Sequence, residues 1–279
     1  MARRHPAVHH LIIYSALLPF LVLALFPVVW MAMTAFKHER DLYTMGVSFW
    51  FNEPPTLKHF RLLFTQTWFG RWIVNTAKVS GAVVVITLAT AVPAAYALAR
   101  FRLPGAQQIG IAMFMTYLVP PIILFVPLTY AVAMLGLLDS SWALVLVYPT
   151  LTIPFCTWLM LGFFRAVPAE IEEAAWIDGC GLMAGLVRVV LPMSVPAIVT
   201  VAIFAFTLSM QEYLYAVVLS LPHPEKVITV GLPTMLIRGD IFFWGALMGG
   251  GLLVGVPVAL LFGAVLDRFI QALTGHSRP

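Results

Sequence analysis

The charged positions of this chain lie far apart, and long stretches with little or no charge separate them. Leu11–Phe36 carries no charge, and Trp72–Leu98 is interrupted only by Lys78. Similar stretches follow at Leu103–Leu138, at Ser140–Phe164, from Val189 to about Leu221 with Glu212 inside, and at Ile241–Leu266. A helix needs about 20 apolar residues to cross a bilayer core of about 30 Å. The pattern therefore predicts an all-α, polytopic membrane protein with six transmembrane helices.

Composition supports this class. Hydrophobic residues make up 61% of the 279 positions and charged residues 10%, whereas an ordinary soluble domain carries about 25% charged residues. The net charge of +4 comes without a run of Lys or Arg, so we expect no nucleic-acid partner. The two cysteines, Cys156 and Cys180, indicate neither a disulfide framework nor a metal site. No cluster of His, Cys and acidic residues has metal-ligand spacing.

The basic residues predict that the N-terminus lies in the cytoplasm. Their totals on the two sides nearly balance, but the short connections discriminate, since "ARFRLPG" is basic and "GLLDSS" has no basic residue. The apolar run at Leu11–Phe36 is too long for a signal peptide, and no small-residue cleavage site follows it. Six spans then place both termini in the cytoplasm and the long segment 37–71 outside.

The acidic residues concentrate in one short segment, "AEIEEAAWIDGCG", at residues 169–181. Pro168 suits the first position of a helix, and three glutamates fall in the first turns, where the helix dipole favours anions. Gly179 can end the helix in a left-handed cap. One stripe of the helix is small and apolar with a carboxylate at its end, and it consists of Ile171, Ala174, Ala175 and Asp178. The segment predicts a docking helix at the cytoplasmic membrane face, with a solvated acidic loop as the alternative.

Several motifs of the chain resemble one transporter family. "EEAAWIDGCG" followed by "VVLPMSVP" resembles the EAA signature of ABC importer permeases. "NTAKVSG", "AAYALARFRLPG" and "SMQEYLYAVVLS" are similar to segments of the carbohydrate-uptake branch, the maltose-permease-like subunits. With the stretch from "VPLTYAVAML" into the EAA segment, and the last span with its tail, the resemblance covers nearly the whole chain.

The resemblance implies a type I ABC importer permease fold over residues 1–279, with a cytoplasmic coupling loop at 165–191. In the family this loop contains a coupling helix that sits in a cleft of the ATPase subunit. Glu173 would anchor the ATPase, Ala174 and Ala175 would pack closely against it, and Gly179 would make the turn between two short helices. The ATPase-coupling residues implied are Glu173, Ala174, Ala175, Asp178, Gly179, Leu191 and Pro192.

The partners and cofactors are also implied by the resemblance. They are a homologous second permease subunit, two ATPase subunits and an extracytoplasmic solute-binding protein, in a bacterial cytoplasmic (inner) membrane. The chain would not be an enzyme and would hold no cofactor of its own, with ATP and Mg²⁺ bound by the ATPase. The absence of a Gly-Lys-Ser/Thr triplet from the sequence agrees with this division.

Two charged residues interrupt the predicted spans. Ionisable groups at membrane depth usually face a bundle interior or water, so Lys78 and Glu212 are candidates for a polar path and for an ion pair with each other. The predicted substrate-path residues are Asn75, Lys78, Gln211, Glu212 and Tyr213. Snorkelling of Lys78 towards the membrane surface is the alternative. Met210-Gln211-Glu212 replaces the Trp-Asn pattern usual in the branch, which suggests a different solute preference.

The predicted function is a permease subunit that imports a sugar or sugar derivative. A neutral disaccharide or glycoside is the first choice, and a glycerol-phosphate-like or sulfonated sugar is the second. An ABC importer for another solute and an ion- or proton-coupled secondary transporter are the alternatives. The segment 37–71 is expected to form part of the outer docking surface, and Gly249–Gly251 is expected to permit close helix packing.

Overall fold

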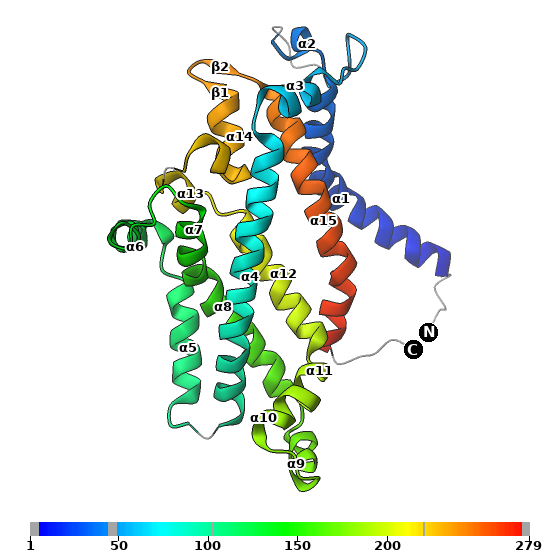
Figure 1. The fold of residues 1–279 in the computed structure, drawn as a ribbon. Helices are drawn as coiled ribbons and strands as arrows, with labels where there is room; N and C mark the ends of the chain where they lie inside the picture. Colours follow the sequence, from blue (N-terminus) through cyan, green and yellow to red (C-terminus); the bar gives the residue numbers. More distant parts are fainter. Residues whose placement is uncertain (1–5, 44–48, 102, 220, 275–279) are drawn as a thin grey trace. The chain divides into compact units, whose positions relative to one another are not determined.

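The computed structural model describes residues 6–43, 49–101, 103–219 and 221–274, and these are mainly helical (Figure 1). The described strands, β1 (Ile237–Arg238) and β2 (Ile241–Phe242), form one small antiparallel hairpin. Contacts divide the chain into two compact units. The first comprises Met1–Phe69 and Leu232–Pro257, and the second comprises Gly70–Gly231 and Val258–Pro279. One domain over 1–279 stays a prediction.

The first unit contains α1 (Pro6–Phe36), α2 (Glu39–Tyr43), α3 (Lys58–Gln66) and the N-terminal part of α15 (Trp244–Thr274). Glycines on α15 let it approach its neighbours closely. A Cβ added at Gly245 would lie 2.4 Å from the His59 ring, and one at Gly250 would lie 2.6 Å from Leu232. The glycine-rich stretch of α15 therefore serves helix packing, as the sequence predicts.

The connection between α2 and α3 is held by Asp41. Its carboxylate accepts the backbone N–H groups of Asn52 at 3.0 Å and of Glu53 at 3.2 Å. Desolvation raises the pKa of Asp41, but the hydrogen bonds from Glu53 and Asn52 outweigh this effect and the pKa lies below its ordinary value. The ionised carboxylate thus fixes part of the segment 37–71.

The second unit contains most of α4 (Phe69–Arg100) and the helices that follow it. These are α5 (Ala106–Tyr117), α6 (Pro121–Met134), α7 (Ser141–Val147), α8 (Pro149–Ala166), α9 (Ala169–Ile177), α10 (Leu182–Gly185), a π-helical turn η1 (Leu186–Val190), α11 (Leu191–Met193), α12 (Val195–Met210), α13 (Leu214–Val218), the 3₁₀ turn η2 (His223–Glu225) and the start of α14 (Ile228–Leu236).

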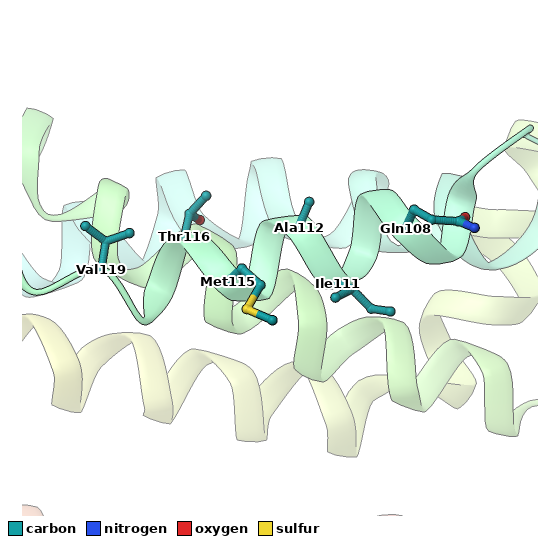
Figure 2. A pocket seen from close by; sticks show the side chains of 6 residues that line it. All are labelled: Gln108, Ile111, Ala112, Met115, Thr116 and Val119. Atoms are coloured by element: carbon teal, nitrogen blue, oxygen red, sulfur yellow. The ribbon is translucent and has the colours of Figure 1, made fainter.

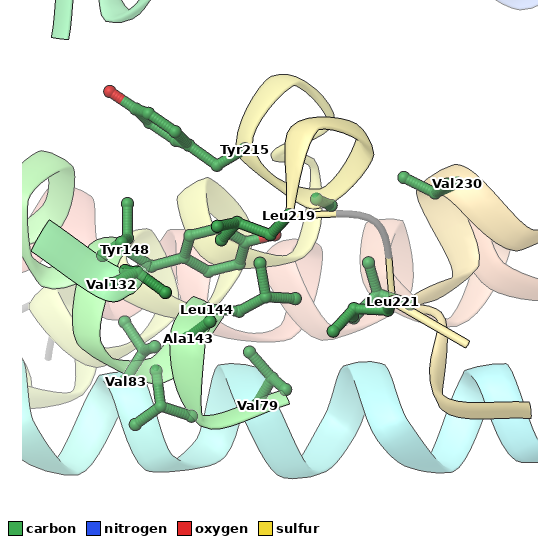
Figure 3. Packing of buried hydrophobic residues seen from close by; sticks show 14 residues of the cluster. Val79, Val83, Val132, Ala143, Leu144, Tyr148, Tyr215, Leu219, Leu221 and Val230 are labelled. Carbon is green, nitrogen blue, oxygen red and sulfur yellow. The ribbon is translucent and has the colours of Figure 1, made fainter. Parts of the chain in front are cut away.

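Two apolar clusters form the core of this unit. In one, Val79 and Val83 of α4 pack with Leu144, Tyr148 and Leu219 (Figure 3). The other joins α4, α8 and α12 around a separate set of buried residues that includes Ala91, Ala95, Met160, Phe164, Val201 and Ala205. Small residues on α4 and α12 let these helices approach α8 closely.

Among the described residues, four helices are long and apolar enough to cross a membrane, at Ile13–Phe36, Phe69–Arg100, Ser141–Ala166 and Trp244–Ala264. Two further helix pairs are bent, α5 with α6 by 90° and Leu182–Met193 with α12 by 77°. Six spans result if each bent pair counts as one. The predicted spans within Leu103–Leu138 and from Val189 to about Leu221 are therefore bent helix pairs in the structure.

Two local features account for these differences. Proline explains the bend between α5 and α6, and α12 ends before the end of the fifth predicted span. Pro120 has ψ 128°, as expected of a residue that precedes a proline and is pushed out of the helical region. The α-helix of the fifth span ends at Met210. Glu212 therefore lies beyond the end of this helix, where the sequence places it inside a span.

Gly231→Ala is predicted to destabilise the second unit. The added Cβ would lie 2.3 Å from the indole ring of Trp72, and this ring is fully buried and donates from Nε1 to the carbonyl of His223 at 2.7 Å. Because the ring is held in place, we expect a loss of about 1–3 kcal/mol, measured as a lower midpoint of thermal unfolding in detergent. Gly81→Ala is the control, since its Cβ meets nothing within 4 Å. An unchanged midpoint in Gly231→Ala would contradict the packing described.

Candidate functional site

The acidic segment forms a helix with a defined end. Pro168 is the N-cap residue, and α9 begins at Ala169, one position after the start predicted from the sequence. At its C-terminal end, Cys180 N–H donates to Ala175 O at 3.0 Å and Gly179 N–H to Trp176 O at 3.1 Å. Gly179 has φ +88°. This is the Schellman arrangement, in which a left-handed glycine turns the chain after a helix, so the prediction of a glycine cap is confirmed.

The outer side of α9 and α10 is both apolar and acidic. Ile177 is 86% exposed and Met183 67% exposed, and Trp176, Leu182 and Val187 are also exposed. Three acids on α9 and its cap lie exposed among these residues, and they are Glu170, Glu173 and Asp178. We call these eight residues the α9–α10 surface. Exposed large apolar side chains gathered with charges are typical of a protein interaction site.

The predicted coupling residues divide between this surface and the interior. Glu173, Ala174, Asp178 and Gly179 are exposed, whereas Ala175 is buried. A Cβ at Gly185 of α10 would lie 3.3 Å from Trp176 Nε1, so glycine at this position lets α10 approach the indole. Leu191 and Pro192 lie in α11, directly after the π-helical turn η1, with Leu191 half-buried and Pro192 exposed.

Glu172 is the acid of this segment that points inward. Its side chain is 2% exposed; one carboxylate oxygen accepts the hydroxyl of Tyr96 at 2.8 Å, and the other accepts Nε–H of Arg100. Arg100 also donates from Nη2 to the carbonyl of Val167 at 2.9 Å. These bonds tie α9 and the turn before it to the C-terminal end of α4. The sequence prediction missed Glu172, although Tyr96 and Arg100 share a helix face at a four-residue spacing that offered a clue.

The path residues Asn75 and Lys78, both on α4, have different surroundings. Asn75 donates from its amide to the carbonyls of Pro224 at 2.9 Å and Lys226 at 3.3 Å. The side chain of Lys78 is exposed, and in the described parts of the chain it forms no ion pair. An ion pair between Lys78 and Glu212 is therefore not present in this structure.

Glu212 caps a helix. Its carboxylate accepts the backbone N–H groups of Tyr215 at 3.1 Å and Ala216 at 3.3 Å, and it thereby satisfies donors at the start of α13. The Thr229 hydroxyl donates to the main-chain carbonyl of Glu212 at 2.9 Å. The neighbours Gln211 and Tyr213 are exposed. Glu212 thus has a structural role, whereas Gln211 and Tyr213 of the same turn present exposed side chains.

Two of the hollows that described residues of the second unit line contain no predicted path residue. One, of about 530 Å³, lies along α5, and Figure 2 shows its lining by Ile111, Met115 and neighbouring side chains. The other, of about 400 Å³, lies near Arg165 and Trp158 on α8. Among the described residues, no group of three or more His, Cys, Asp or Glu side chains could hold a metal ion.

Comparison with known proteins gives a consistent family. Residues 91–276 match the family described as "Binding-protein-dependent transport system inner membrane component". The chain is 33% identical to the sulfoquinovosyl glycerol transport system permease protein SmoH of Agrobacterium fabrum, over 91% of this chain and 88% of that protein. It is 32% identical to the maltodextrin transport system permease protein MdxG of Bacillus subtilis, over 78% of this chain and 79% of that protein.

A solved structure shares the fold. It is a bacterial ABC transporter involved in the import of the acidic polysaccharide alginate, with a TM-score of 0.77 at 21% sequence identity over 96% of this chain and 99% of that one. The matched fold confirms the all-α, multi-pass architecture predicted from the sequence.

Gly179→Ala is predicted to disturb the end of α9, whereas Gly181→Ala is predicted to be tolerated. Neither added Cβ meets an atom within 4 Å, but only Gly179 has a positive φ. An L-residue in the left-handed conformation costs about 1–2 kcal/mol, so we expect faster protease cleavage between α9 and α10 in Gly179→Ala alone. Equal cleavage rates in the two variants would contradict the left-handed cap.

Proposed function

The chain belongs to the family of inner membrane components of binding-protein-dependent transport systems, and from this premise we propose that it admits a sugar or sugar derivative and takes its energy from a separate ATPase at the α9–α10 surface. It is a multi-pass permease subunit of an ABC importer, and it is not itself an enzyme. An ion- or proton-coupled secondary transporter is not favoured, because the family depends on a binding protein.

The observation that carries the proposal is the exposed, mixed character of the α9–α10 surface. Ile177 and Met183 expose apolar area that water disfavours, and Glu173 adds a charge that can pair with a basic group of a partner. The partner proposed is the ATPase, with the residues Glu173, Ala174, Ala175, Asp178, Gly179, Leu191 and Pro192 forming or supporting the contact. ATP and Mg²⁺ belong to that partner, and no cofactor is assigned to this chain.

The remaining assembly follows from the same family. We propose a homologous second permease subunit, two ATPase subunits and an extracytoplasmic solute-binding protein. A cytoplasmic position for α9 requires both termini to be cytoplasmic if six spans are counted, which agrees with the basic connection after α4. The segment 37–71, held partly by Asp41, would then face outward and contribute to the docking of the binding protein.

The proposed solute class is supported by the names of the relatives. Sulfoquinovosyl glycerol, maltodextrin and diacetylchitobiose are the solutes in the names of three of them. Asn75, Lys78, Gln211, Glu212 and Tyr213 remain the proposed path residues. Of these, Lys78, Gln211 and Tyr213 present exposed side chains, which suit hydroxyl groups and, at Lys78, an acidic substituent.

Glu173→Lys is predicted to prevent the ATPase from docking while the membrane fold persists. Reversal of an exposed charge at an interface centre should weaken the contact by about 2 kcal/mol or more, roughly thirtyfold. Co-purification of the ATPase and the rate of ATP hydrolysis measure this. Glu225→Lys, an equal reversal at an exposed residue of η2, serves as the control. Normal ATPase binding by Glu173→Lys would count against the proposed surface.

The solute-binding protein of the same transport system is predicted to bind a sugar or sugar derivative. A thermal-shift screen would compare neutral disaccharides and glycosides, sulfonated and phosphorylated sugars, and amino acids and peptides. Since ligand binding to the folded state raises its stability, the sugar that binds should raise the midpoint of unfolding. A response to amino acids or peptides alone would reject the sugar class.

A further inference from the structure

A buried polar joint connects α9 to α4. We define the α4–α9 joint as Tyr96, Arg100, the carbonyl of Val167, and Glu172. The side chain of Glu172 is 2% exposed and that of Arg100 12%, so the ion pair is largely removed from water. Both carboxylate oxygens of Glu172 are engaged, by Tyr96 and by Arg100.

The joint also reaches α8. The guanidinium of Arg100 donates to the carbonyl of Val167, which is the C-cap residue of α8. The ring of Tyr96 packs edge-on against Phe164 of α8, with centroids 5.7 Å apart. Thus α4, the end of α8 and α9 are held at one place. Removal of one member of a buried ion pair is strongly destabilising, because it leaves the other charge buried without a partner.

Neighbouring glutamates on α9 point in different directions. Glu173 is exposed on the α9–α10 surface, whereas Glu172 is buried in the joint. A short helix of nine residues therefore joins a candidate docking face to a transmembrane helix. In Figure 1, α9 and α10 lie at the lower end of the view, next to the chain that leads from α8.

α4 extends far from the joint. Its 32 residues span about 48 Å at 1.5 Å per residue. Asn75 and Lys78, both proposed path residues, lie near the end of α4 opposite to Arg100. Pro93 lies inside this continuous helix, between Lys78 and Arg100.

We propose that Glu172, Arg100 and Tyr96 transmit the displacement of α9 to α4, so that ATPase closure moves the polar end of this helix. This inference rests on the proposed function, because it takes α9 as the docking site of the ATPase. The three are positioning residues, since they act through α4 and contact neither ATP nor solute. Their loss separates ATP hydrolysis from the movement of α4.

The test measures that separation in the assembled transporter. Val74 of α4 is 49% exposed and becomes the reporter as Val74→Cys, in a Cys180→Ser background in which Cys156 stays buried. The complex with the second permease and the ATPase is reconstituted in lipid vesicles. A membrane-impermeant maleimide labels the reporter without nucleotide and with ATP plus vanadate, and phosphate release is measured in parallel.

The intact joint should give a labelling rate that changes with nucleotide by about fivefold or more. Glu172→Gln, which keeps the shape of the side chain, should remove this change while ATP hydrolysis stays within about twofold. Glu170→Gln is the matched control, since it removes an exposed carboxylate of the same helix and should behave as the parent. Tyr96→Phe removes one hydroxyl from the joint, keeps the ring against Phe164, and should reduce the change partly.

Each other result overturns the inference. A full nucleotide response in Glu172→Gln or Tyr96→Phe would show that the joint is only a structural brace. If Glu172→Gln does not assemble, the response of Tyr96→Phe decides. A parent complex that hydrolyses ATP without any change in labelling would show that α4 does not move. A parent chain that binds no ATPase would instead reject the proposed function.

Discussion

The bonds between Glu172 and α4 set the position of α9. A carboxylate that is 2% exposed needs a positive partner and a full set of donors, because an isolated buried charge is very unfavourable. Arg100 and Tyr96 supply both, and removal of one member of such a pair typically costs about 3–5 kcal/mol. α9 can therefore shift relative to α4 only if that cost is met. The exposed acids and apolar side chains of α9 are held outward for the same reason.

The end of α9 adds a second constraint. Gly179 takes a left-handed conformation and ends the helix, so that α10 folds back with Gly185 beside Trp176. The buried side of α9 and the glycine turn together limit the directions that its outer face can adopt. A surface built on short helices usually lacks rigidity, since short helices are marginal on their own. Here the Arg100–Glu172 ion pair and the turn at Gly179 hold α9 in place, and helix propensity contributes very little.

The sequence predicted the helical stretches well, because charge is excluded from the membrane core and its positions divide the chain. It predicted less well where a stretch bends. Pro120 and Pro121 are visible in the sequence, but proline is common in membrane helices and by itself gives no bend angle. Glu172 and Glu212 were harder still. Glu172 accepts hydrogen bonds from Tyr96 and Arg100, which are distant in the sequence, and Glu212 caps α13. The spacing of apolar residues along a sequence does not reveal hydrogen bonds of this kind.

Under the proposed function, coupling and solute choice depend on different residues of α4. Arg100 and Lys78 are both cations of α4. The guanidinium of Arg100 donates to the buried carboxylate of Glu172 and to the carbonyl of Val167, whereas the side chain of Lys78 is exposed. A change at Arg100 must alter the fold around α9, but a change at Lys78 leaves those bonds in place. Under the proposed function, solute preference can therefore vary at the Lys78 end of α4 while the Arg100 end stays fixed. Lys78 and Arg100 are separated by about 33 Å of helix at about 1.5 Å per residue, and screened charges at that distance do not interact directly.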